Sequence, residues 1–163
     1  MLRTILISAA LALIGVSAQA QETSEAETVA RAYMEAYSEL DWAAMEALMS
    51  ENIIFADHTA TGTDDPEGIV TEGREALLEM LRGFEAQYHP IELGFVWETV
   101  FNSNDTVVFI GHVNALYPTE DPARHFRWRS QQVAAVTVRD GIVIAHRDFA
   151  NYPGAEQGLV PAE

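Results

Sequence analysis

The sequence predicts an α+β domain in which one curved antiparallel sheet wraps around a few helices near its N-terminus. Apolar residues recur at helical spacing between residues 22 and 49. Four runs rich in β-branched and aromatic residues then fill residues 91–149, and turn-forming residues separate them. Helices followed by a run of strands are typical of an α+β domain.

The N-terminus has the pattern of a secretory signal peptide. Arg3 is followed by an apolar stretch and by Ala18-Gln19-Ala20, a site of the kind that signal peptidase reads. We expect cleavage after residue 20, a domain over residues 21–152 and a loosely ordered tail over 153–163. The alternative is an uncleaved anchor, but a spanning helix needs about 20 apolar residues. We therefore expect an exported protein, periplasmic or secreted, with no stable membrane association after cleavage.

Composition removes several classes of function. The 163-residue chain has a formal net charge of −16, no cysteine and no lysine. Schiff-base, thiolate and disulfide chemistry are excluded, and nucleic acid and anionic membrane surfaces would repel the chain. The remaining catalytic side chains are Asp, Glu, His, Tyr, Ser and Thr.

Three helices are expected. Residues 22–40 place one apolar stripe on a first helix, Asp41 is a suitable N-cap for a short second helix, and residues 74–84 return to helical spacing. The stripe of the first helix contains Val29, Tyr33, Ala36, Tyr37 and Leu40, and that of the second contains Trp42, Met45, Leu48 and Met49.

Five strands are expected. The first covers residues 53–57, and a polar loop from 58 to 73 follows it. The other four cover residues 91–101, 106–117, 125–138 and 142–149 and form a meander.

Two carboxylates stand at the ends of apolar strands. Asp57 ends the run Ile53-Ile54-Phe55, and Asp148 ends the run that begins at Ile142. A carboxylate in this position is often a solvated strand end. If it faces a cavity instead, it can serve as a general base or acid.

One strand face carries unexpected polar residues. Because side chains alternate, Val108, Ile110, His112, Asn114 and Leu116 share one face, and Ile144, His146 and Asp148 share another. His112 and Asn114 interrupt an apolar face, which favours a pocket wall where Asp148 orients His112 for proton transfer. A satisfied polar core network is the alternative.

A cationic stripe is expected on the strand at 125–138. His125, Arg127 and Arg129 alternate with aromatic residues and so share one sheet face. Such a stripe is usually solvated, but it could also pair with acidic residues across a dimer interface or hold a carboxylate-bearing ligand. Asp57 and His58, with Asp64 and Asp65 nearby, match no zinc or calcium spacing, so no metal is expected.

The order of these elements resembles the nuclear transport factor 2-like superfamily, near its SnoaL-like branch. The resemblance covers about residues 27–152. It is carried by a strand ending in Phe55-x-Asp57, a helix start at residues 73–77 (Gly-Arg-Glu-Ala-Leu), four long strands, and a finish in His146-Arg147-Asp148-Phe149. The resemblance implies a cone-shaped α+β roll, as in cystatin-like folds, that encloses an apolar pocket.

Two enzymes of this superfamily offer residue-level comparisons. Against ketosteroid isomerase, Asp57 matches the general base and Tyr33 the oxyanion donor, while the second donor position holds Ala134. Against limonene epoxide hydrolase, Asp148 matches one catalytic aspartate, His112 stands at the arginine position and Asn114 at the other aspartate. These departures count against either specific reaction.

The resemblance implies cofactor-independent acid–base catalysis on a small apolar or aromatic molecule: isomerisation, cyclisation, dehydration or hydrolysis. The expected catalytic group is Asp57, His112, Asp148, Tyr33 and Asn114. The expected ligand-binding group is Phe55, Trp42, Ile110, His146 and Trp128. A non-catalytic binding or carrier module with the same pocket is the alternative, and a homodimer that uses the domain as an assembly unit is a third reading.

Overall fold

A computed structural model describes residues 24–60 and 68–162. The expected signal peptide at 1–20 lies outside these residues. The helices are α1 (Glu25–Ser38), α2 (Trp42–Ala47) and α3 (Arg74–Tyr88), with a short 3-10 helix η1 (Tyr152–Gly154). The strands are β1 (Met49–Asp57), β2 (Ile69–Glu72), β3 (Phe95–Ser103), β4 (Thr106–Pro118), β5 (Arg124–Arg139), β6 (Ile142–Ala150) and β7 (Glu156–Pro161). No helix in the described part of the chain is long and apolar enough to cross a membrane.

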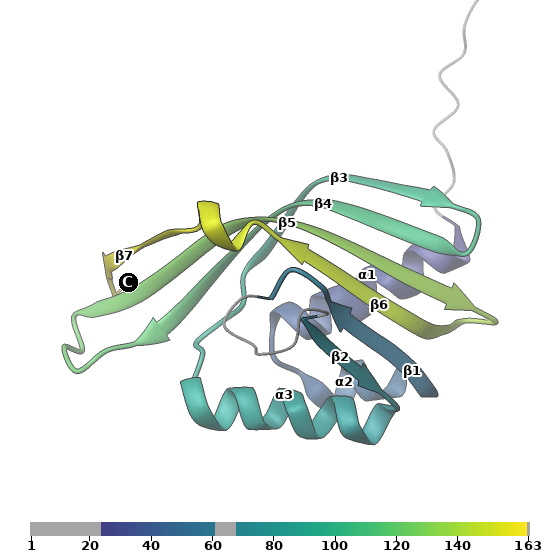
Figure 1. The fold of residues 1–163 in the computed structure, drawn as a ribbon, viewed down its shortest axis with the longest axis horizontal. Helices are drawn as coiled ribbons and strands as arrows, with labels where there is room; N and C mark the ends of the chain where they lie inside the picture. Colours follow the sequence, from purple (N-terminus) through teal and green to yellow (C-terminus); the bar gives the residue numbers. More distant parts are fainter. Residues whose placement is uncertain (1–23, 61–67, 163) are drawn as a thin grey trace, which may run out of the picture.

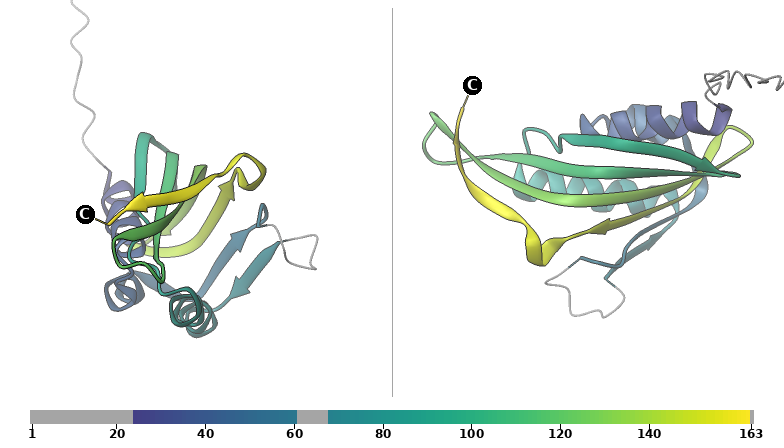
Figure 2. Two further views of the ribbon diagram at one scale, coloured as in Figure 1. Left: turned by 90° about the vertical axis from the view of Figure 1, so that its left-hand side faces the viewer. Right: turned by 90° about the horizontal axis from the view of Figure 1, so that it is seen from above.

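The α+β prediction is confirmed: one curved seven-stranded sheet has its helices on one side (Figure 1, Figure 2). The strand order is β2-β1-β6-β5-β4-β3, so the expected meander runs from β3 to β6. The sheet is mixed rather than purely antiparallel, because β1 pairs with β6 in parallel. The predicted loop at 58–73 also contains a strand, β2, which pairs with β1.

The expectation of a loosely ordered tail was wrong. β7 pairs with residues 124–129 of β5, whereas β6 pairs with residues 132–139 of the same strand. β6 and β7 thus follow one another along one edge of β5, and η1 forms the corner between them. The ends of β4 and β5, with β7, extend past the helices (Figure 1). The corner brings the hydroxyl of Tyr152 within hydrogen-bond distance of Asp57 at the end of β1.

Helix α2 begins after the expected N-cap Asp41, and α1 begins after Ser24, which was not among the expected caps. Ser24 accepts a hydrogen bond from the backbone N–H of Glu27, and Asp41 accepts one from Ala44. Between the helices Leu40 takes a left-handed conformation with φ 62°, and the chain bends there. On α1, Tyr33 and Met34 are buried against the sheet.

The sheet has an inner face toward the helices and an outer face away from them. On β4, Val107, Phe109, Val113 and Ala115 are buried on the inner face. The residues between them, including Ile110 and His112, lie on the outer face, where Ile110 is 40% exposed. Side-chain alternation therefore groups the residues of β4 as expected, but the group with His112 faces outward.

A bulge in β6 sets the direction of its polar residues. Val138 pairs with Val143 and Thr137 with Ala145, so Ile144 is an extra residue relative to β5. The bulge shifts the alternation, and both Val143 and His146 are consequently fully buried. Asp148 follows His146 on the inner face.

Candidate functional site

The centre of the candidate site is His146, which is fully buried under the inner face. Its Nδ1 lies 3.2 Å from the hydroxyl of Tyr33 on α1, and its Nε2 lies 2.9 Å from Oδ1 of Asp148. The carboxylate can only accept at this contact, so Nε2 carries the proton. In the neutral imidazole Nδ1 then accepts from the Tyr33 phenol. One helix and one strand thus build a Tyr–His–Asp chain.

Aromatic rings fix the orientation of this imidazole. Phe55, Tyr37 and Tyr33 meet it edge to face, with ring centroids at 5.0, 5.4 and 5.4 Å. Phe55 is the register partner of His146 on the neighbouring strand. The ring is therefore held by both hydrogen bonding and packing.

Asp57 belongs to a second buried hydrogen-bond cluster. Its Oδ1 accepts from the backbone N–H of Thr59 at 3.0 Å and from the Thr59 hydroxyl at 2.8 Å. Its Oδ2 accepts from the hydroxyl of Tyr152 at 2.6 Å. Thr59 Oγ1 also accepts from the backbone N–H of Ala150, which ties the end of β1 to the end of β6.

The two clusters meet because Asp57 and Asp148 are register partners on the parallel strands β1 and β6. Parallel neighbours lie about 4.8 Å apart. Both carboxylates are buried, with 7% and 4% exposure. Among the described residues, the one ion-pair partner of either is His146. Two acidic groups thus lie side by side with a single imidazole and no arginine.

Burial and the neighbouring carboxylates raise the pKa values of three tyrosines. Burial raises the pKa of Tyr33 well above its usual value, and the charge of Asp148 raises it further. Burial likewise raises the pKa of Tyr37, with added effects from Asp148, Tyr33, Tyr152 and Asp57. The pKa of Tyr152 is raised by burial, by its hydrogen bond to Asp57 and by the charge of that carboxylate. All three phenols therefore remain protonated donors at neutral pH.

The predicted pairing of His112 with Asp148 was wrong. His112 lies on the outer face, where its Nδ1 is 3.4 Å from Oε1 of Glu98, while Asp148 bonds His146 on the inner face. Asn114 and Ile110 share the outer face with His112. Side-chain alternation cannot tell which of two partly apolar faces meets the helices.

Other predicted site residues do face the interior. Asp57, Asp148, Tyr33, Phe55 and His146 converge there. Trp42 is buried and its Nε1 donates to Glu85 at 2.5 Å. Trp128 packs on the inner cluster around Leu93. The roles assigned to all of these residues stay predictions.

Sequence reasoning missed Tyr152 and Thr59. Tyr152 lies at the start of η1, and its ring is 5.5 Å from that of Trp128. A Thr two residues after Asp57 is a recognisable side-chain turn, in which the carboxylate accepts from the backbone ahead of it. No local signal links Tyr152 to Asp57, because the two are 95 residues apart.

This arrangement suits proton transfer. A carboxylate with one oxygen fixed by Thr59 and the other facing a phenol can accept a proton, and protonated phenols can stabilise a negative oxygen. Among the described residues, no group of three or more histidines and acidic residues is placed to hold a metal ion.

The fold agrees with comparisons against known proteins. A family model for the SnoaL-like domain matches residues 30–146, and the chain belongs to this family. No curated protein sequence matches significantly.

Solved structures share the fold. A protein described as a SnoaL-like polyketide cyclase from Shewanella putrefaciens CN-32 is 22% identical, with a TM-score of 0.66, over 81% of this chain and 93% of that one. A computationally designed 17-OHP binder is 19% identical, with a TM-score of 0.63, over 83% and 99%. An LEH-like epoxide hydrolase from M. tuberculosis is 15% identical, with a TM-score of 0.59, over 80% and 85%. At these identities the likeness shows the fold alone.

Proposed function

We propose that this chain is a cofactor-independent acid–base enzyme that acts on a small apolar molecule in the interior of its cone. The observation that carries the proposal is the pair of buried carboxylates, Asp57 and Asp148, which lie side by side and have no basic partner but His146 within residues 24–60 and 68–162. Buried like charges oppose folding, and such groups concentrate at functional sites. Residues 1–20 lead us to propose further that the enzyme works after export.

Asp57 is the proposed base. Thr59 fixes its Oδ1, whereas Tyr152 supplies the one hydrogen bond that Oδ2 accepts from the described residues. A substrate that displaces this hydroxyl meets a free carboxylate oxygen. Asp57 then takes a proton from a carbon next to a carbonyl group, and the electron pair of the broken C–H bond moves to the carbonyl oxygen.

Tyr152 is the proposed oxyanion donor. Its raised pKa keeps the phenol protonated beside Asp57. After displacement it donates a hydrogen bond to the developing enolate oxygen. Asp57 then returns its proton to another position of the substrate. Tyr33 lies in the same interior, where its protonated phenol donates to His146 and His146 in turn donates to Asp148.

A non-catalytic binding module is the second candidate. The Tyr33–His146–Asp148 chain is fully buried and internally satisfied, as a structural network would be. A designed protein with this fold is described as a 17-OHP binder. In this reading the same interior holds a ligand without turnover.

Exchange of carbon-bound protons with deuterated solvent separates the two candidates. The protein is incubated in D2O with a panel of small apolar ketones, and loss of the α-proton NMR signals is followed. We expect faster exchange of at least one ketone with the wild-type protein, and a loss of about 100-fold or more in Asp57→Asn. Asp140→Asn is the matched control, because Asp140 lies in an exposed turn with φ 51°, which asparagine tolerates.

Ligand binding is followed in parallel through the fluorescence of Trp42 and Trp128. A ketone that changes the fluorescence yet shows no exchange above background would favour the binding module. Equal exchange in the wild type and Asp57→Asn would remove Asp57 from the role of base.

A further inference from the structure

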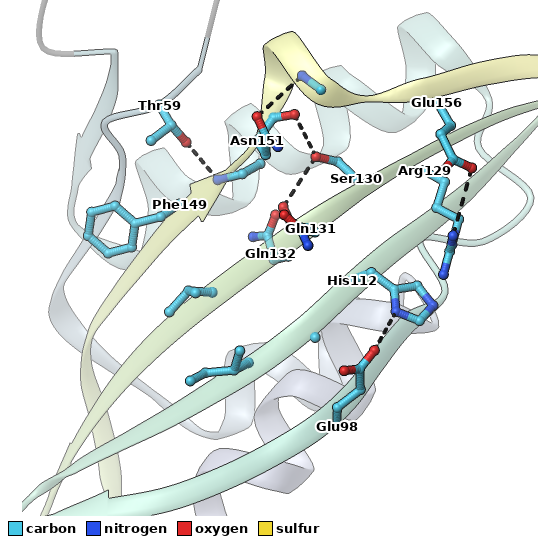
Figure 3. Close-up of a pocket in the computed structure, with 15 residues that line it drawn as sticks. Thr59, Glu98, His112, Arg129, Ser130, Gln131, Gln132, Phe149, Asn151 and Glu156 are labelled. Atoms are coloured by element: carbon cyan, nitrogen blue, oxygen red, sulfur yellow. Dashed lines mark hydrogen bonds and ion pairs between the residues drawn. The ribbon is translucent and has the colours of Figure 1, made fainter.

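An open groove of about 770 Å³ lies over the outer face of the sheet (Figure 3). Its lining comes from strands β3 to β6, the corner at η1, Glu156 of β7 and Thr59, which follows β1. His112 and Asn114, assigned to a pocket wall from the sequence, lie on this face. The groove is thus a second place where the chain could hold a ligand.

The pairing of the strands arranges polar and apolar residues in order along the groove. Arg129 lies opposite Asn114, Gln131 opposite His112, and Val133 opposite Ile110. On its other side Val133 lies opposite Phe149 of β6. The surface therefore changes from cationic at Arg129, through polar at Gln131, to apolar at Val133.

The apolar end is a patch on three adjacent strands. Ile110 and Phe149 are each 40% exposed, and Val133 lies between them. Phe149 and Arg129 stand at opposite ends of the groove in Figure 3. Large apolar side chains that adjoin one another across strands favour contact with an apolar molecule.

At the cationic end of the groove, the charged side chains form long ion pairs with exposed glutamates. Arg129 lies 3.7 Å from Glu156, and the two side chains are 41% and 68% exposed, so this ion pair contributes little stability. Arg127 lies on the same face of β5, two residues before Arg129. Its Nε is buried and has no hydrogen-bond partner in the described part of the chain. His112 adds a third group that can be cationic, 3.4 Å from the exposed Glu98. An external carboxylate would find the guanidinium of Arg129 here, whose ion-pair partner among the described residues is the exposed Glu156.

We propose that this groove binds an amphipathic carboxylate, with its head at Arg129 and an unbranched apolar tail over Ile110, Val133 and Phe149. The carboxylate takes the place of Glu156 at the guanidinium, with His112 on the neighbouring strand beside it. Arg129 and Val133 are four residues apart, or about 13 Å along a strand. This length suits a medium-chain fatty acid such as decanoate.

The groove meets the proposed catalytic site at Thr59, which lines the groove and hydrogen-bonds Asp57, but the proposed head and tail contacts lie elsewhere. The groove lies on the outer face, whereas Asp57 and Asp148 face the interior. Ligand binding in the groove should persist in Asp57→Asn, so failure of one proposal leaves the other standing.

The test is a titration of the full mature chain with decanoate, followed by NMR of backbone amides and methyl groups. We expect saturable shifts at Ile110, Val133 and Gln131. Arg129→Gln should weaken binding by at least about fivefold, the size of one partly exposed charged contact. Phe149→Ser should weaken it independently through the tail. Arg82→Gln on α3 removes the same charge far from the groove and should leave the affinity unchanged.

Two probes and one measurement of mass complete the test. Decanol keeps the tail without the charge and acetate keeps the charge without the tail, so each should bind more weakly than decanoate. Equal binding of decanol and decanoate would overturn the role of Arg129. Shifts confined to inner-face residues such as Phe55 and His146 would also overturn the proposal. So would a stable dimer in sedimentation equilibrium whose formation buries Ile110 and prevents decanoate from binding.

Discussion

Asp57 and Asp148 occupy paired positions on the parallel strands β1 and β6, and both side chains point into the interior of the domain. Thr59 and Tyr152 hydrogen-bond the first carboxylate, and His146 hydrogen-bonds the second. Neither carboxylate is neutralised by an arginine among the described residues. We expect two like charges in such a pair to oppose stability, and four predictions concern the polar groups of the two strands.

Removing one of the paired charges should stabilise the domain. In Asp57→Asn the amide oxygen can still accept from Thr59 and the amide N–H can donate to Tyr152, while the repulsion with Asp148 disappears. We expect the free energy of unfolding in urea to rise by about 1 kcal/mol. Asp41→Asn is the control, because asparagine and aspartate cap helices equally well. A loss of stability in Asp57→Asn would instead assign the charge a structural role.

Tyr33→Phe should destabilise the domain more than Tyr37→Phe. The Tyr33 hydroxyl bonds His146, so its removal leaves a buried ring nitrogen without a partner and should cost about 1–3 kcal/mol. Tyr37 packs on the same imidazole, but its hydroxyl makes no hydrogen bond to another described residue. Its substitution should change stability by a few tenths of a kcal/mol. Equal losses in urea denaturation would show that packing alone matters.

The two histidines of the strands should differ sharply on truncation. His146→Ala leaves a cavity among three rings and two unsatisfied groups, so we expect a loss of about 3 kcal/mol. His112→Ala removes an outer-face contact with Glu98 and should cost about 0.5 kcal/mol or less. Thermal unfolding of both variants measures the contrast. A large loss in His112→Ala would contradict its placement on the outer face.

Stability should fall steeply above pH 10. The pKa values of Tyr33, Tyr37, Tyr117 and Tyr152 are raised in the folded protein, whereas tyrosines of an unfolded chain titrate near pH 10. Above about pH 10 the folded state therefore binds more protons than the unfolded state, and the free energy of unfolding decreases as pH rises. The contribution of these phenols is complete below pH 10 and is lost as pH rises toward the folded pKa values.

Tyr152→Phe tests this linkage. It removes one of the titrating groups, so between about pH 10.5 and 12 the decrease in unfolding free energy should be shallower by up to about 1.4 kcal/mol per pH unit. Urea denaturation at several pH values gives both slopes, and the neutral-pH stability of the same variant corrects for the lost hydrogen bond. Identical slopes would contradict the burial of this phenol beside Asp57.

Local sequence patterns predict most helices and strands and, within the candidate site, the two aspartates. Ser24 and Asp41 cap α1 and α2, and the apolar runs of β4 to β6 follow the expected meander. Asp57 and Asp148 were recognisable because each ends an apolar strand. The inward direction of the Asp148 side chain depends on the bulge at Ile144, and no residue type at this position predicts a bulge.

The remaining features depend on contacts between distant segments. β4 has apolar residues on both faces, Val107 and Phe109 on one and Val108 and Ile110 on the other, so alternation alone could not place His112. The tail contains Pro153, Gly154 and Gly158, which are typical of a loop, yet β5 supplies a free edge on which β7 forms. Tyr152 reaches Asp57 only because that edge fixes the corner at η1.

The parallel pairing of β1 with β6 also affects the order in which contacts form during folding. Contacts between residues far apart in sequence form late, because closing a long loop costs entropy before any contact repays it. Asp57 and Asp148 lie on strands that are far apart in the sequence but adjacent in the sheet. The meander must extend to β6 before β1 can pair with it. A chain shortened before residue 142 lacks β6 and cannot assemble the paired acids, so we expect the pair to form late in folding.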